Sequence, residues 1–149
     1  CKYPPIGHRS VAGAQPMLDF QSFPMAEATK AVNNATLTVL MLETPTAIRN
    51  ANDIASVEGV DCLLIGTNDL CMEMGIPGEL DHPEIMEAYK QTITACKKHG
   101  KFVGMGGVYN FDAMRVYIDM GVQLVLAGND LSFMISAGRE QTNKLRSLA

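Results

Sequence analysis

The sequence is poor in positive charge and in long apolar runs. It contains 12 Lys and Arg residues against 16 Asp and Glu, a net charge of −4, and no cluster of basic residues interleaved with aromatic ones. A nucleic-acid surface needs positive charge to displace counterions, so this composition disfavours nucleic-acid binding and favours a small-molecule partner. The apolar runs at 37–42 and 62–65 are far shorter than the roughly 20 residues that cross a bilayer, so no transmembrane segment is expected.

Cysteine is also scarce and shows no pairing pattern. Cys1, Cys62, Cys71 and Cys96 are widely spaced, and Cys62 and Cys96 lie in apolar patterns where a thiol acts as a small hydrophobic group. We therefore expect reduced cysteines and a cytosolic (cytoplasmic) protein rather than a disulfide framework. The chain begins with neither an initiator methionine nor a secretory signal, so we expect it to start inside a longer protein.

What the sequence does contain is an alternation of apolar runs and helical segments. An irregular lead at 1–35 includes a short predicted helix at 25–33, and four runs of strand length then follow, each with a predicted helix behind it. Thr44 is the expected cap of the first of these helices, while Gly100 and Gly121 end the second and third. The predicted strands are 36–42, 62–65, 102–105 and 124–127, and the helices are 44–57, 81–99, 111–120 and 131–148, with a loop at 66–80.

The strands are apolar throughout rather than alternating, which is typical of parallel sheets buried on both faces. Two architectures satisfy this pattern: a small open parallel sheet, and half of a (β/α)8 barrel, which needs about 250 residues when complete. Polar residues follow each strand, as at 43–44 and 66–69, and this is the rim where barrel enzymes place their chemistry. We predict an α/β fold forming the C-terminal half of a (β/α)8 TIM barrel, with residues 1–149 as one partial domain and four βα units in 36–149.

Two carboxylates follow neighbouring strands. Glu43 comes directly after the first strand and Asp69 lies four residues past the second, so both can converge at the rim. Two protein carboxylates, with the remaining positions left to water and a chelating substrate, suit a hard divalent cation such as Mg2+ or Mn2+. Zinc more often takes His or Cys. The alternative from spacing alone is that each carboxylate caps a helix.

The remaining candidate residues have plainer interpretations. Gly66, Gly106 and Gly107 allow the backbone to approach a ligand and present N–H groups to it, and the alternative is that they only form tight turns. His82 is interpreted as part of a helix cap rather than as a base. Cys71 could face the site but has no identifiable base beside it. The sequence has no GxGxxG, P-loop, CxxC or HExxH motif, so nucleotide-binding and zinc-hydrolase functions lack support.

Several short segments carry a family resemblance through their order and spacing: YPPIGHRS at 3–10, LET at 42–44, VEGVD at 57–61, IGTNDL at 65–70, MG at 74–75 and HPE at 82–84. Together they resemble the HpcH/HpaI aldolase family of class II pyruvate aldolases. The resemblance implies that Glu43 and Asp69 are the metal ligands, and that the backbone of Gly66, Thr67 and Asn68 contacts the pyruvate carboxylate. It also suggests a role for Arg9 at the site edge or in a subunit contact.

This chain departs from the family pattern in two respects. Met41 stands where the family often has a glutamine, so that polar contact to the ligand is missing. The catalytic histidine and the enolate-stabilising arginine of the family lie on earlier strands. We therefore expect both residues upstream of Cys1, and we assign no catalytic acid or base within this chain.

The resemblance implies a metal-dependent aldolase that cleaves or forms a C–C bond in a 4-hydroxy-2-oxo acid, giving pyruvate and an aldehyde through a metal-stabilised enolate. One alternative is a decarboxylase or other C–C lyase acting on a 2-oxo diacid. Another is a non-catalytic half-barrel that binds a ligand or mediates assembly. The final helix has more apolar residues than its own core needs, which favours a homo-oligomer; they are Leu131, Phe133, Met134, Ile135 and Leu145.

Overall fold

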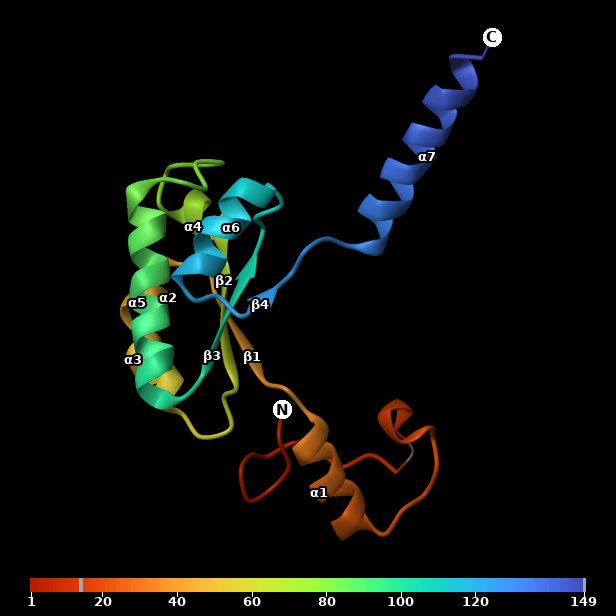
Figure 1. Cartoon of the computed structure of the whole chain (residues 1–149). Coiled ribbons are helices and arrows are strands. Elements are labelled where there is room, and N and C mark those ends of the chain that lie inside the picture. Colours follow the sequence, from red (N-terminus) through yellow and green to blue (C-terminus); the bar gives the residue numbers. More distant parts are fainter. Residues whose placement is uncertain (14, 149) are drawn as a thin grey trace.

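The computed structural model describes residues 1–13 and 15–148 and contains a four-stranded parallel sheet in the order β1-β2-β3-β4 (Figure 1). A 3-10 turn and one helix precede the sheet, and helices follow every strand. The elements are η1 (Pro16–Leu18), α1 (Met25–Ala35), β1 (Val39–Leu42), α2 (Pro45–Arg49), α3 (Ala51–Ser56), β2 (Cys62–Gly66), α4 (Thr67–Glu73), α5 (Pro83–His99), β3 (Phe102–Gly106), α6 (Phe111–Met120), β4 (Leu124–Val125) and α7 (Asp130–Arg146).

The strand register brings the carboxyl ends of the strands to one edge of the sheet. Leu42 of β1 pairs with Ile65 of β2, and Gly66 of β2 pairs with Gly106 of β3. All three pairings between strands are parallel. Residues that follow β1, β2 and β3 are therefore neighbours in space although they are far apart in the sequence.

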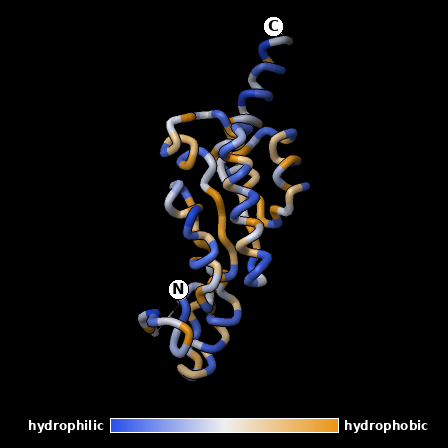
Figure 2. The backbone as a smooth tube through the Cα atoms, turned by 90° about the vertical axis from the view of Figure 1, so that its left-hand side faces the viewer, coloured by the Kyte–Doolittle hydropathy of each residue, from blue (hydrophilic) through white to orange (hydrophobic). Residues whose placement is uncertain are grey.

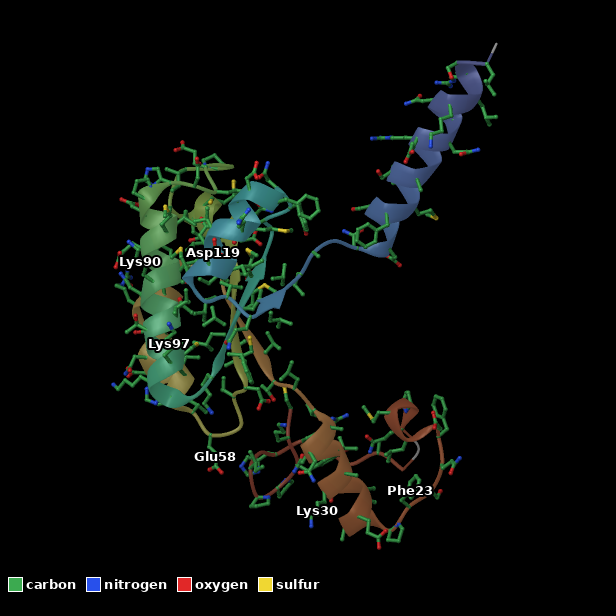
Figure 3. The ribbon with its side chains drawn as sticks, in the orientation of Figure 1. Phe23, Lys30, Glu58, Lys90, Lys97 and Asp119 are labelled. Carbon is green, nitrogen blue, oxygen red and sulfur yellow. The ribbon has the colours of Figure 1, made fainter. Side chains whose placement is uncertain are left out.

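The main core lies between the sheet and the helices on one of its faces. Leu63 and Ile65 of β2 are fully buried there, and α5 supplies Ile85, Tyr89 and Ile93 to the same cluster. In Figure 2 the apolar strands run between helices whose outward positions are hydrophilic. Lys90 and Lys97, labelled in Figure 3, are two exposed charged residues of α5.

The opposite face of the sheet is only partly covered. Val39 is 37% exposed and Met41 is 52% exposed, whereas all five residues of β2 are buried. The prediction that every strand is buried on both faces is therefore wrong for β1, and β4 is likewise only half-buried. The physical reason is that the helices following β1, β2 and β3 pack on one face, which leaves apolar side chains uncovered on the other.

Several predicted boundaries are confirmed at the residues that cap helices. The hydroxyl of Thr44 accepts a hydrogen bond from the N–H of Ala47 at 3.1 Å, with Pro45 at the first helical position. Gly100 adopts the left-handed conformation, φ 65°, that ends α5. These are local interactions between residues close in sequence, which is why the sequence pattern revealed them.

Other boundaries differ from the prediction. The helix expected through residue 57 is two helices, because Asn50 leaves helical geometry at φ −91°, ψ 4°. The loop expected at 66–80 begins with α4, which packs Leu70 and Cys71 into the core. The last strand shortens from 124–127 to two residues because β4 pairs with β3 only at Leu124 and Val125.

The N-terminal segment is attached to α1 by a reciprocal pair of hydrogen bonds. The N–H of Tyr3 donates to Oδ1 of Asn33 at 2.7 Å, and Nδ2 of Asn33 donates to the carbonyl of Tyr3 at 3.1 Å. Lys2 adds an ion pair with Asp61 at 3.7 Å, close to the start of β2. In Figure 1 this unit lies beyond the amino ends of the strands, away from the edge where the strands end.

Helix α7 extends away from the sheet and has no buried residue (Figure 1). Its exposed apolar side chains include Phe133, which is 61% exposed, and Met134, which is 67% exposed. Within residues 1–13 and 15–148, no helix combines the length and the apolar character required to cross a membrane.

Candidate functional site

A hollow of about 220 Å³ lies at the edge of the sheet where β1, β2 and β3 end. It brings together all five residues that the sequence analysis assigned to the site: Glu43, Gly66, Thr67, Asn68 and Asp69. Its other lining residues are Met41, Leu64, Gly106, Gly107, Tyr109 and Leu126. The parallel register is what assembles them, because the carboxyl ends of parallel strands meet at one edge.

Glu43 is held against the backbone of β2. It follows β1 directly, is half-buried, and lies beside Gly66 because Leu42 is in register with Ile65. A β-carbon placed on Gly66 would lie 2.9 Å from Oε1 of Glu43. Glycine is therefore needed at position 66 to make space for the carboxylate of Glu43. This reason for a glycine differs from the tight turn that was considered from sequence alone.

Asn68 and Asp69 lie in the first turn of α4 and are exposed. Asn68 contacts the turn after β3: a β-carbon on Gly107 would lie 2.9 Å from Nδ2 of Asn68. Gly107 has φ +82°, a backbone conformation that L-residues rarely adopt. Gly66 at the end of β2 and Gly107 in the turn after β3 thus allow polar side chains to approach the backbone around the hollow.

The side chain of Thr67 faces away from the hollow. It is fully buried, and its hydroxyl lies 2.7 Å from the hydroxyl of Tyr89 on α5. The part of Thr67 that lines the hollow is consequently its backbone.

The donor set suits a hard divalent cation. In the described part of the chain, Glu43 and Asp69 take part in no ion pair, and their carboxylates accept no side-chain or backbone hydrogen bond. The residues that line the hollow include no Lys, Arg or His. Two uncompensated carboxylates beside an open space are the oxygen ligands that Mg2+ or Mn2+ prefers.

Glu43 and Asp69 by themselves do not form a complete metal cage. Among residues 1–13 and 15–148, no three or more His, Cys, Asp or Glu side chains converge to form a metal-binding group.

Three lining residues were missed by the sequence analysis. Leu64 and Leu126 form apolar walls, and Tyr109 reaches the hollow from the turn after β3. The alternation of side chains along β2 provides a signal for Leu64, because it lies two residues before Gly66 and therefore on the same face. Tyr109 has no comparable signal, since it lies in an irregular turn.

The other candidate residues lie away from this hollow. Nδ1 of His82 accepts the N–H of Glu84 at 3.3 Å and caps α5, as predicted. Cys71 is buried in the core beside Leu70, so the expectation that it could face the site is wrong. Burial raises the pKa of its thiol and keeps it protonated. Arg9 stacks over the ring of Tyr3 at 5.1 Å, within the N-terminal segment.

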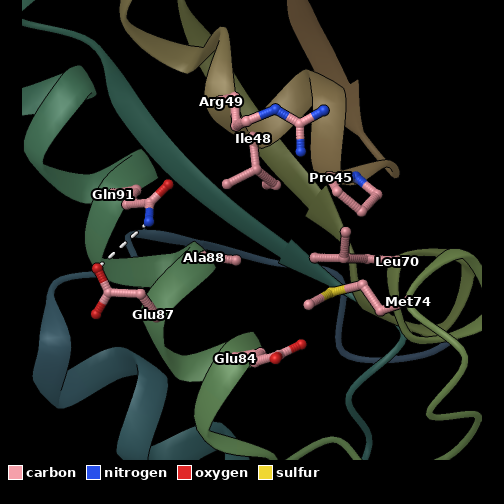
Figure 4. Close-up of a pocket in the computed structure, with 9 residues that line it drawn as sticks. All are labelled: Pro45, Ile48, Arg49, Leu70, Met74, Glu84, Glu87, Ala88 and Gln91. Carbon is pink, nitrogen blue, oxygen red and sulfur yellow. Dashed lines mark hydrogen bonds between the residues drawn. The ribbon is translucent and has the colours of Figure 1, made fainter.

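A second hollow, also of about 220 Å³, opens between α2, α4 and α5 (Figure 4). Apolar groups such as Ile48, Leu70 and Met74 form much of its wall, and Gln91 is tied to Glu87 by a hydrogen bond of 3.4 Å. It is built from side chains of the helical layer and lacks the strand-end carboxylate and glycines of the first hollow. We therefore assign the site to the edge of the sheet.

The chain is a parallel α/β protein with a hollow at the carboxyl ends of its strands that is lined by two carboxylates. The sequence model of the HpcH/HpaI aldolase/citrate lyase family matches residues 1–137. The chain belongs to this family, as the short motifs predicted.

Individual relatives agree with this assignment. The chain is 40% identical over 111 residues to a 4-hydroxy-4-methyl-2-oxoglutarate aldolase of Hapsidospora irregularis, covering 74% of this chain and 41% of the relative. It is 33% identical over 138 residues to a 5-keto-4-deoxy-D-glucarate aldolase of Klebsiella pneumoniae, covering 91% of this chain and 52% of the relative. The chain thus spans about half the length of the curated relatives it matches.

The fold matches solved structures of the same family. The HpcH/HpaI aldolase of Desulfitobacterium hafniense superposes with a TM-score of 0.82 at 26% identity, covering 99% of this chain and 57% of the other. The α/β fold with a parallel sheet is therefore shared with a solved HpcH/HpaI aldolase.

Proposed function

We propose that this chain is half of a divalent-metal-dependent aldolase that cleaves or forms a C–C bond in a 4-hydroxy-2-oxo acid, giving pyruvate and an aldehyde. The observation that carries this proposal is the pair Glu43 and Asp69, two carboxylates without a compensating charge at the ends of neighbouring strands. The aldolase names of the relatives described above support the reaction class.

We also propose that the complete fold is a (β/α)8 barrel and that this chain is its C-terminal half. The uncovered apolar face of β1, with Val39 and Met41 exposed, supports this, because an apolar sheet face in water needs a covering layer. In a barrel that face would line the interior, and the four remaining strands would complete it.

In the proposed site, Glu43 and Asp69 would hold Mg2+ or Mn2+ through carboxylate oxygens. The cation, when bound, supplies Lewis acidity that polarises the oxo group of a 2-oxo acid and makes its neighbouring C–H more acidic. The backbone at Gly66, Thr67 and Asn68 contacts the substrate carboxylate, since the first N–H groups of a helix have no partner inside the helix. Leu64 and Leu126 exclude water from the apolar side of the hollow.

A metal-bound water, or a histidine outside this chain, would move the proton. The hollow is lined by no His, Arg or Lys of the described residues, and Tyr109 is its only phenol there. We place the acid–base histidine and the arginine that stabilises the enolate in the upstream half, as the family resemblance implies.

We further propose that the protein is a homo-oligomer that covers the apolar residues of α7. A 17-residue helix with no buried residue and several exposed apolar side chains would be unstable on its own in water. Burial against another subunit would remove this exposed surface.

The experiment that tests the proposed function uses the full-length protein with Mg2+ or Mn2+. We expect release of pyruvate from 4-hydroxy-2-oxo acids and metal-dependent exchange of the methyl protons of pyruvate in deuterated water. Glu43→Gln and Asp69→Asn should each abolish both activities. Glu73→Gln, an exposed carboxylate at the other end of α4, is the matched control and should leave them unchanged.

The same assay separates the alternatives. Carbon dioxide released from oxaloacetate without aldol cleavage would indicate a decarboxylase. A protein that folds normally but neither cleaves these substrates nor exchanges pyruvate protons would refute the aldolase assignment, and the absence of any cation affinity would favour a binding or assembly module.

A further inference from the structure

The hydroxyl groups of Thr67 and Tyr89 form a hydrogen bond of 2.7 Å in the core behind the proposed metal site. Both side chains are fully buried, and they come from different elements: Thr67 is the first residue of α4, and Tyr89 lies in the middle of α5. A buried hydroxyl needs a hydrogen-bond partner, so each residue satisfies the other.

Thr67 occupies the centre of the segment that carries the site. The residue before it, Gly66, lies against the carboxylate of Glu43. The two residues after it are Asn68, which contacts the turn at Gly107, and the proposed ligand Asp69. Any displacement of Thr67 therefore moves the peptide groups on both sides of it.

Tyr89 is itself rigidly held. Its ring stacks on that of Tyr117 from α6, with centroids 3.9 Å apart and planes inclined by 24°. The hydroxyl of Tyr117 in turn donates to the carbonyl of Leu80. The Tyr89 hydroxyl is thus presented to Thr67 from a packed aromatic pair rather than from a mobile side chain.

The start of α4 lacks a side-chain cap, although Gly66 pairs with Gly106 in the sheet and Leu70 and Cys71 pack into the core. Gly66 is its N-cap and provides no side-chain hydrogen bond, and the helix has only seven residues. A helix this short depends on tertiary contacts for its stability and orientation. Thr67 lines the hollow, and its side chain is hydrogen-bonded to Tyr89 in the helical layer.

We propose that Tyr89 is a positioning residue for the metal site: through Thr67 it holds the first turn of α4 in the orientation in which Asp69 lines the same hollow as Glu43. This inference rests on the proposed function, because it assigns Tyr89 a role toward the cation that Asp69 would bind. Partners that orient a metal ligand without touching the metal commonly affect its affinity.

The test compares Mn2+ affinity and backbone hydrogen exchange in the full-length protein. Tyr89→Phe keeps the ring and its stacking and removes only the hydroxyl, so we expect about 10-fold weaker Mn2+ binding and faster exchange of the amides in residues 66–73. Thr67→Val should produce the same changes, the double variant should be no worse than either single one, and Thr67→Ser should retain affinity near that of the natural protein.

Tyr117→Phe is the matched control. It removes a hydroxyl from the other member of the stacked pair without touching Thr67, so it should lower the melting temperature while leaving Mn2+ affinity and exchange in 66–73 unchanged. The proposal is overturned if Tyr89→Phe behaves in the same way as Tyr117→Phe.

The two measurements also separate this proposal from the proposed function. If the unaltered protein binds no Mn2+, the metal assignment fails and so does the role of Tyr89 toward it. If it binds Mn2+ and Tyr89→Phe neither weakens binding nor speeds exchange in 66–73, only the positioning role is refuted.

Discussion

Glu43 lies so close to Gly66 that a β-carbon on the glycine would stand 2.7 Å from Cγ and 2.9 Å from Oε1 of the glutamate. Non-bonded carbon atoms do not approach each other this closely, because their optimal separation is about 3.5–4.0 Å. The position of the carboxylate at the end of β1 therefore depends on the absence of a side chain at the end of β2.

Gly66→Ala should move Glu43 out of the hollow. We expect Mn2+ affinity to fall by about 10-fold or more, since one of the two proposed protein ligands would be displaced. Isothermal titration of the cation measures this effect, and circular dichroism verifies the fold. Gly138→Ala is the control, because a β-carbon at Gly138 meets nothing within 4 Å. An unchanged affinity for Gly66→Ala would mean that Glu43 does not bind the cation.

Gly107→Ala should impair the site through Asn68. Forcing φ +82° on an L-residue costs about 1–2 kcal/mol, and the new methyl group would also press on the Asn68 amide. We expect a lower free energy of unfolding in urea and a raised KM for the 2-oxo acid. Combining the change with Asn68→Ala should relieve the contact with Nδ2 but leave the backbone strain. If the double variant is as stable as the natural protein, the backbone strain does not contribute.

Stability should fall at alkaline pH because of buried acidic groups. Burial, with smaller contributions from Cys96 and Asp61, raises the pKa of Cys62 from 9.0 to about 11. Burial likewise raises the pKa of Tyr117 from 10.0 to about 12. The folded state therefore binds these protons more tightly than the unfolded chain, so their contribution is complete below pH 9 and is lost as the pH rises towards 11 and 12.

Urea unfolding between pH 7 and pH 11 measures this loss. Cys62→Ala should make the decline between pH 9 and pH 11 shallower, even though it lowers stability overall by leaving a cavity. If the free energy of unfolding of the variant falls as steeply between pH 9 and pH 11 as that of the natural protein, the titration of Cys62 is not coupled to folding.

The four thiols should differ in reactivity. Cys1 is exposed, whereas Cys62, Cys71 and Cys96 are buried, free and protonated because burial raises the pKa of each. A thiolate is the reactive species, so a maleimide reagent at neutral pH should label Cys1 alone until the protein unfolds. Mass spectrometry of the labelled peptides tests this, and rapid labelling of Cys71 in the folded protein would contradict its place in the core.

The apolar surface of α7 should determine the oligomeric state. Replacing Met134 and Ile135 by Lys places charge where the proposed interface buries apolar groups, so we expect dissociation or a smaller assembly. Ser132→Lys, at an exposed position of the same helix, is the control. Sedimentation velocity measures the mass of each assembly. If the Met134 and Ile135 double variant has the same mass as the Ser132→Lys control, the interface lies elsewhere.

The resemblance of short motifs to the HpcH/HpaI family predicted the family, and all five residues assigned to the site line the hollow, whereas Leu64, Tyr109 and Leu126 were missed. Glu43, Gly66, Asn68 and Asp69 could be chosen because each follows a strand within a few residues, and parallel strands end at one edge. The role of Gly66 as space for Glu43 could not be predicted, since it depends on the distance between two strands that are separated by a helical connection.

The sequence alone therefore determined the features that depend on neighbours along the chain: the strand–helix alternation, the caps at Thr44 and His82, and the helix ends at Gly100 and Gly121. Tertiary structure decided the features that depend on packing between distant segments. Helix α4 forms where a loop was expected, and Cys71 lies in the core. One face of β1 is uncovered, and the hydroxyl of Thr67 is hydrogen-bonded to that of Tyr89. The physical reason is that local hydrogen bonds are specified by adjacent residues, whereas burial is specified by whichever segments the fold brings together.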